Sequence, residues 1–151
     1  MRSLIVLSFS LLSLRSFALD TSGCSPLPQV EKTAVTAQGN SLRVTALKAP
    51  SQACWNVSES SVTVAYQWSQ KSLNTDGISV HFWVSINGNE RNLDSEIECQ
   101  DMAQFYEADV RCTATATFVV GNISAWNVEV APQLSGKWDT RGYGNNYNFM
   151  F

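Results

Sequence analysis

The C-terminal stretch GKWDTRGYGNNYNF combines two side-chain chemistries that suit one kind of ligand. The residues that carry them are Trp138, Asp139, Asn145, Asn146 and Tyr147. Trp and Tyr present flat apolar faces on which the CH groups of a sugar ring can stack, while amides and carboxylates can hydrogen-bond its hydroxyls. Because the stretch is too rich in turn formers for a helix, we expect an aromatic platform flanked by hydrogen-bonding groups, as a neutral sugar requires.

Two further tryptophans are candidates for the same chemistry. In the stretch ISVHFWVSI the apolar residues occupy even positions, so Trp83 and His81 point to the opposite face. Trp83 is therefore either exposed or covered by the N-terminal segment. Trp68 ends the stretch SVTVAYQW, and both a binding and a structural role are open for it.

The sequence contains few of the residue patterns that catalytic sites require. His81 is the single histidine, and neither a Gly-Xaa-Ser-Xaa-Gly elbow nor a phosphate loop is present. Four acids cluster at Asp94, Glu96, Glu98 and Asp101, and a glycosidase needs two carboxylates about 5 to 10 Å apart. Alternating acids on an edge strand are usually a solvated face. We therefore predict a protein that is not an enzyme and that binds no metal and no cofactor.

Strands must position these side chains, because the apolar residues recur with a period of two. The stretches that alternate in this way are 41–47, 61–68, 78–86, 112–120 and 126–130. Asn87-Gly88 predicts a hairpin, with 89–98 as the returning strand. The alternation also makes Tyr66 and Trp126 structural.

These elements predict an all-β protein. Short strands separated by Gly, Asn and Pro favour an immunoglobulin-like antiparallel β-sandwich over residues 41–151. Residues 19–40 are predicted to be an irregular N-terminal segment held by a disulfide.

Residues 1–18 have the features of a secretory signal peptide. Arg2 supplies the positive start, an apolar core follows that is too short for a permanent bilayer anchor, and Ser16 and Ala18 put small residues before a cleavage site after Ala18. We expect a secreted, extracellular protein whose mature chain of roughly 130 residues forms one domain. An uncleaved anchor is the alternative.

A secreted protein folds in an oxidising compartment, and the cysteines are interpreted for that environment. They are Cys24, Cys54, Cys99 and Cys112. No Cys-x-x-Cys pair occurs, and one histidine with wide spacings does not match a zinc ligand set, so we predict two disulfides. Of the three possible pairings, we favour Cys24–Cys54, which ties down the N-terminal segment, and Cys99–Cys112, which closes a loop between neighbouring strands.

The charge balance narrows the range of partners. Without Arg2 and Arg15, the 10 basic side chains fall to 8 against 13 acidic ones, a formal charge of −5. A negative chain without a basic run argues against nucleic acid and anionic membrane as partners. The sequons that begin at Asn56 and Asn122 predict glycosylation on exposed turns. We expect a monomer.

The closing stretch resembles the W-D-N-N-x-G-x-N-Y ending of starch- and glycogen-binding carbohydrate-binding modules, which are β-sandwiches of about this size. SVTVAYQWSQKS resembles the strand that precedes a Trp-containing binding loop in those modules, so the likeness covers residues 60–151. The glucan contacts that it implies are Trp138, Asp139, Asn145 and Asn146, with Trp68 as a second aromatic. Tyr147 is either a packing or a binding residue. The family's Asp-Asn-Asn is replaced by DTRG at 139–142.

We therefore predict a secreted, non-catalytic protein that binds α-glucan or a related neutral polysaccharide by aromatic stacking and by hydrogen bonds from Asn and Asp. A second hypothesis is an immunoglobulin-like protein-interaction or cell-surface module that meets a protein partner through its acidic edge and terminal loops. A third is an enzyme that uses acids of the 94–98 stretch.

Overall fold

The structure is a computed structural model that describes residues 29–48, 59–102, 110–121, 126–141 and 145–151. Within these ranges all regular structure is β-strand, which confirms the all-β prediction. The strands are β1 (Gln29–Val35), β2 (Ser41–Leu47), β3 (Ser60–Gln70), β4 (Val80–Ile86), β5 (Asn89–Asp94), β6 (Glu96–Asp101), β7 (Val110–Val120), β8 (Asn127–Leu134), β9 (Lys137–Trp138) and β10 (Tyr147–Met150).

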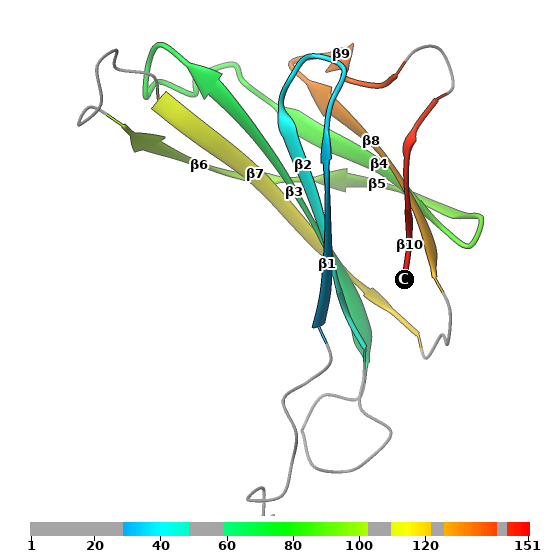
Figure 1. Cartoon of the computed structure of the whole chain (residues 1–151). Helices are drawn as coiled ribbons and strands as arrows, with labels where there is room; N and C mark the ends of the chain where they lie inside the picture. The colour runs from blue at the N-terminus through cyan, green and yellow to red at the C-terminus, as the bar shows by residue number, and fades with distance from the viewer. Residues whose placement is uncertain (1–28, 49–58, 103–109, 122–125, 142–144) are drawn as a thin grey trace, which may run out of the picture.

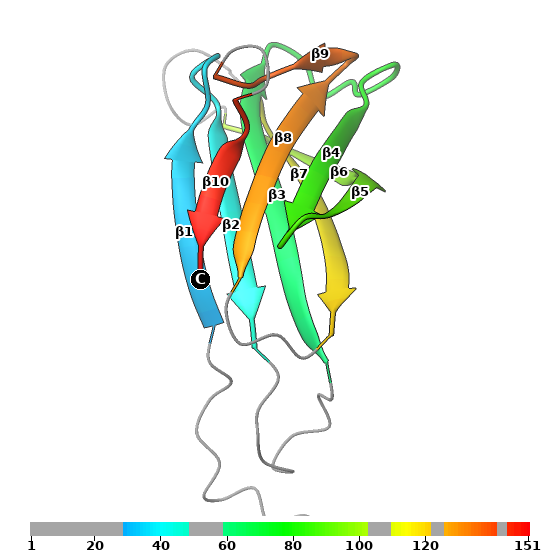
Figure 2. The same cartoon turned by 90° about the vertical axis from the view of Figure 1, so that its right-hand side faces the viewer.

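The strands form two antiparallel sheets (Figure 1). Sheet A has the order β1-β2-β3-β7-β6, and sheet B has the order β10-β8-β4-β5, with β9 also paired to β8. The two sheets come close at the edges where β1 and β10 lie side by side (Figure 2), and there Lys32 Nζ donates a hydrogen bond to the Met150 carbonyl. The Lys32 ammonium also lies 5.5 Å from the centre of the Phe151 ring.

The core lies between the sheets and is built from the predicted apolar rows. On β2, Leu42, Val44 and Ala46 have no exposed surface. The corresponding rows of β3, β4, β7 and β8 belong to the same buried cluster, because residues two apart on a strand share one face. Tyr66 and Trp126 are fully buried in it, as the alternation predicted.

The predicted hairpin at Asn87-Gly88 is confirmed. β4 and β5 pair from Ile86 opposite Asn89 to His81 opposite Asp94. Asn87 and Gly88 both have positive φ, 49° and 86°, as the tight turn of a two-residue hairpin demands.

The N-terminal segment is more regular than predicted. Residues 29–35 are not irregular: they form β1, which pairs with β2 along its whole length. All of its side chains except Ala34 are exposed. Because β1 is an edge strand stabilised by backbone hydrogen bonds, it carries no apolar row that a sequence pattern could reveal.

The predicted returning strand 89–98 is divided between the two sheets. β5 pairs with β4 in sheet B, whereas β6 pairs with β7 in sheet A. Ser95 lies at the crossing, and its Oγ donates a hydrogen bond of 2.6 Å to the Val80 carbonyl. The alternation of side chains continues through this crossing, so it gives no sign that the chain changes sheets.

The predicted Cys99–Cys112 disulfide is present and joins two directly opposite residues of β6 and β7. Cys24, Cys54, the sequon residues Asn56 and Asn122 and the segment 1–18 lie outside the described residues. Across the described ranges, no helix has the length and hydropathy of a membrane span.

Candidate functional site

The closing motif begins with a tight hairpin that the alternation analysis did not recognise. β8 runs on to Leu134, and Ser135 and Gly136, with φ of 45° and 80°, turn the chain back into β9. Trp138 then lies opposite Gln133. The local signal for this turn was Ser-Gly, a dipeptide typical of turns, between the apolar end of β8 and Lys137.

Trp138 points away from the core. Its partner Gln133 lies opposite His81, on the outer face of sheet B, because the flanking residues Pro132 and Leu134 lie opposite Phe82 and Val80 of the core row. The Trp138 side chain is 50% exposed. Of the tryptophans that the structure describes, it is the one most open to solvent.

Asp139, the next residue, points inward, and this corrects the expectation that it contacts a ligand. Its side chain has no exposed surface. The Gln38 backbone N–H donates to Oδ1 at 3.0 Å, and Tyr66 Oη and Asn40 Nδ2 donate to Oδ2 at 2.8 and 3.1 Å. The Thr36 hydroxyl also donates to Oδ2. A buried carboxylate with this many donors is a structural group.

The Asp139 network joins the two sheets. Thr36, Gln38 and Asn40 belong to the turn between β1 and β2, which itself closes through hydrogen bonds from Thr36 N to the Asn40 carbonyl and from Asn40 N to Thr36 Oγ1. Asp139 N donates to the Pro132 carbonyl in sheet B. The carboxylate therefore ties the β1–β2 turn to the backbone that carries Trp138.

Tyr147 is a packing residue. It is 1% exposed and its hydroxyl accepts a hydrogen bond of 2.7 Å from the Ala37 backbone N–H. The Arg141 guanidinium lies 5.2 Å from the centre of its ring. Burial raises the pKa of Tyr147, and burial together with the Asp139 hydrogen bond raises the pKa of Tyr66, because both favour the neutral phenol.

Trp68 is also buried, which favours the structural one of its two open roles and not the glucan contact that the resemblance implied. It is 6% exposed, stacks on Tyr66 with ring centres 5.9 Å apart, and donates from Nε1 to Gln70 Oε1 at 3.0 Å. The sequence placed Trp68 at the end of a strand and did not indicate that its side chain is buried. Its side chain follows Tyr66 on the inward face of β3.

Trp83 shares the outer face of sheet B with Trp138. It lies opposite Ala131 of β8 on one side and Asn92 of β5 on the other, and it is partly buried. Since β9 and β4 flank β8, the backbones that carry Trp83 and Trp138 are separated by about 10 Å across the strands and about 7 Å along them. Two aromatic side chains far apart in the sequence therefore lie on one surface.

Polar groups surround this pair. His81 lies opposite Gln133 on one side and Asp94 on the other, and its Nδ1 lies 2.8 Å from Asp94 Oδ1. The sequence analysis had not selected His81, Asn92 or Gln133 as site residues. Their only signal was that they share the outer face with Trp83, at odd positions of β4 and β8 and at an even position of β5.

The two asparagines of the motif are near the surface. Asn145 is exposed and its carbonyl accepts a hydrogen bond of 3.2 Å from Arg141 N, and Asn146 is partly exposed. Residues 142–144 lie outside the described part of the chain.

The acidic residues of the 94–98 stretch do not lie together on one surface. Asp94 lies on the outer face of sheet B, opposite His81, whereas Glu96 and Glu98 lie opposite Thr115 and Thr113 in sheet A. No group of three or more His, Cys, Asp or Glu in the described ranges is arranged to hold a metal ion.

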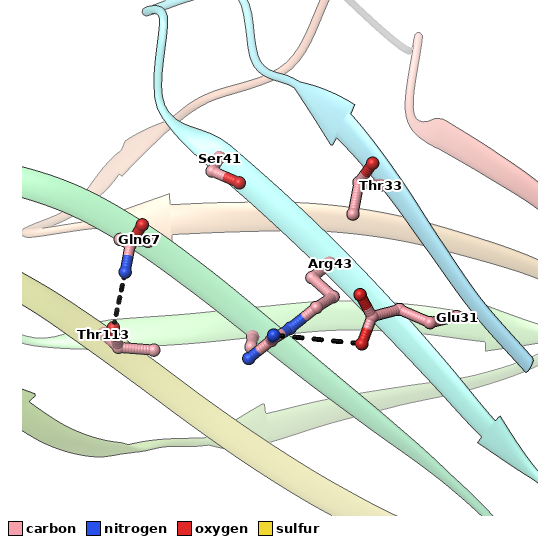
Figure 3. Close-up of a pocket in the computed structure, with 7 residues that line it drawn as sticks. Glu31, Thr33, Ser41, Arg43, Gln67 and Thr113 are labelled. Atoms are coloured by element: carbon pink, nitrogen blue, oxygen red, sulfur yellow. Dashed lines mark hydrogen bonds and ion pairs between the residues drawn. The ribbon is translucent and has the colours of Figure 1, made fainter. Parts of the chain in front are cut away.

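A shallow hollow on the outer face of sheet A is a second feature (Figure 3). It has a volume of about 180 Å³ and is lined by polar side chains around Ala65. Arg43 lies 3.8 Å from Glu31, and Gln67 donates to Thr113 at 3.2 Å. Because these groups pair with each other and no aromatic ring lines the hollow, we place the candidate site on sheet B.

No protein-family model matches this chain, and neither a curated protein nor a solved structure matches it.

Proposed function

We propose that this protein is a secreted, non-catalytic carbohydrate-binding protein with an immunoglobulin-like β-sandwich fold. Its ligand is a neutral polysaccharide, with α-glucan favoured by the resemblance of the closing motif. The observation that carries the proposal is the half-exposed Trp138 on the same outer sheet face as Trp83. Two antiparallel sheets around one core support the sandwich, although the described disulfide lies within one sheet and not between the sheets.

In this proposal Trp138 stacks on one sugar ring and the exposed part of Trp83 contacts another. His81, Asn92 and Gln133 hydrogen-bond hydroxyls between and beside the two rings. Asn145 and Asn146 extend the polar rim at the end of the motif. Stacking of apolar sugar faces with a few exposed hydrogen bonds gives weak affinity, in the micromolar to millimolar range, or about −4 to −8 kcal/mol.

Asp139 has a supporting role in this site. Its buried carboxylate holds the backbone on which Trp138 is mounted, so it limits the orientations that the indole can take. A rigid aromatic loses little entropy on binding.

The proposal is tested by affinity electrophoresis in gels that contain starch, glycogen, cellulose, chitin or β-glucan. We expect retardation in at least one of these gels, and Trp138→Ala should weaken binding about 10- to 30-fold, as the loss of a central Trp contact does. Val35→Ala is the matched control, because Val35 is 72% exposed on sheet A. Equal circular dichroism spectra would show that both variants fold. Migration unaffected by every polysaccharide would refute the proposal.

A further inference from the structure

The second half of β7 has a free edge. β3 pairs with β7 over its whole length, but β6 pairs only from Val110 to Thr115. Among the described residues, no strand pairs with the other edge of residues 116–120. Every second residue of such an edge presents its backbone N–H and C=O outward, ready to pair with another strand.

This edge lacks the usual protection against pairing. Its sequence, ATFVV, has no charged residue and no proline, which are the common means of blocking an edge strand. Val119 is 57% exposed on the outer face. Phe118, opposite Val62 of the core, is partly exposed on the inner face.

A groove of about 350 Å³ runs beside the free edge, between the ends of the two sheets. Sheet A contributes the apolar residues 118–120, and sheet B contributes Ile86 and the polar start of β5, Asn89, Glu90 and Arg91. Phe118 and Val120 point to the inner side, so a strand added to β7 would place alternate side chains in this groove. Backbone pairing with pockets for alternate side chains is how sheet edges bind extended peptides.

Arg91 adds a charge preference. It lies opposite Val84 of the core row, so its side chain is on the inner face of β5, at the groove. It is exposed, and its guanidinium makes no ion pair with any residue that the structure describes. The other charged group of the groove, Glu90, lies opposite Ser85 on the outer face of β5, so on the inner side the Arg91 cation favours an acidic side chain in the occupant.

We propose that this edge is a docking site for an extended segment of a partner protein. The segment pairs with residues 116–120 of β7 as an added strand, in the place beside β7 that β6 leaves at Thr115. Its alternate apolar side chains enter the groove, and one acidic side chain meets Arg91. The site lies on a different part of the molecule from Trp138 and is independent of sugar binding.

The test is a nuclear magnetic resonance titration of the ¹⁵N-labelled protein with a synthetic probe. The probe is an end-blocked peptide of about seven residues, the length of a short strand, with alternating valine and threonine and one central glutamate. We expect amide shifts confined to residues 116–120 and 89–91. A probe with N-methylated backbone amides, which cannot donate to the edge, should cause none.

The role of Arg91 is tested with Arg91→Ala. We expect about two- to fivefold weaker binding of the glutamate probe, the effect of an exposed ion pair, and no change with a glutamine probe. Arg111→Ala is the control, because Arg111 is an exposed cation on β7, the strand with the free edge, but lies opposite Gln100 and Ser69 and away from the groove. Trp138→Ala should leave peptide binding unchanged, which separates this proposal from the sugar site.

The proposal is overturned if millimolar probe leaves the amides of 116–120 unshifted or if shifts centre elsewhere. It is also overturned if the peptide-free protein sediments as a dimer with those amides protected from exchange, since the edge would then be occupied by a second copy. Equal binding of the glutamate and glutamine probes would refute the acidic preference.

Discussion

Replacement of Asp139 by alanine should destabilise the protein more than any exposed substitution in the closing motif. The carboxylate accepts hydrogen bonds from Thr36, Gln38, Asn40 and Tyr66. Alanine removes the acceptor and leaves the buried hydroxyls of Thr36 and Tyr66 without it, whereas Gln38 and Asn40 are at least partly exposed. A buried donor without a partner costs about 1–3 kcal/mol.

The total is less than the sum of these costs, because hydroxyl groups rotate and water can enter the space. We estimate a loss of about 3–5 kcal/mol for Asp139→Ala, similar to removing one member of a buried charged network. Asp139→Asn should cost only about 1–2 kcal/mol. Its oxygen can still accept from the Gln38 N–H, and the Thr36 and Tyr66 hydroxyls can turn to accept from the new amide.

Urea unfolding followed by circular dichroism measures this difference. With the slope usual for a small domain, the midpoint should fall by about 2 M for Asp139→Ala and by less for Asp139→Asn. Asp94→Ala is the control, because the Asp94 side chain is 94% exposed and its removal should leave the midpoint unchanged. If Asp139→Ala unfolds with the wild-type midpoint, or if Asp139→Asn is the less stable variant, the assigned role of the buried carboxylate is wrong.

Three further predictions concern pH, the disulfide and the hairpin. Because the pKa of Tyr66 and Tyr147 is raised in the folded state, these groups should leave the free energy of unfolding unchanged below about pH 10 and lower it above that, by up to about 1.4 kcal/mol per pH unit for each tyrosine. Unfolding curves recorded from about pH 8 to about pH 11 in steps of about one pH unit measure this slope. A free energy of unfolding that does not change with pH would contradict the prediction. Reduction of the Cys99–Cys112 disulfide, or its double replacement by serine, should cost about 3 kcal/mol, because it opens a loop with a sequence separation of 13 residues. An unchanged melting temperature would contradict this estimate. Gly88→Ala should cost about 1 kcal/mol, since φ is 86° and no atom crowds the position, and a gain in thermal stability would contradict this reasoning.

The strands could be predicted where one face of a strand is buried. Leu42, Val44 and Ala46 alternate with polar residues, and the strand that they predicted, 41–47, has the same bounds as β2. The Asn87-Gly88 turn and the Cys99–Cys112 bridge were also predictable, because a short turn and the cysteines of adjacent strands depend on local sequence.

Other features required the tertiary structure. β1 is stabilised by pairing with β2 and has no buried row, so its sequence pattern carries no signal. The alternation that runs from β5 into β6 is the same in both sheets, so only the fold shows that the chain changes sheets at Ser95.

The candidate site, too, could be predicted only in part from the sequence. The residue types at Trp138, Asp139 and Trp83 indicated aromatic stacking and hydrogen bonding, and the alternation around Trp83 placed it on the outer face. The side to which Trp138 and Asp139 point depends on the pairing of the short β9 with β8. That pairing turns the indole to solvent and the carboxylate into the network of Thr36 and Tyr66. An alternating pattern shows which residues share a face within one strand. The neighbours of that face are set by contacts between segments that are distant in the sequence. For this reason only the folded chain brings Trp83 and Trp138 onto one surface.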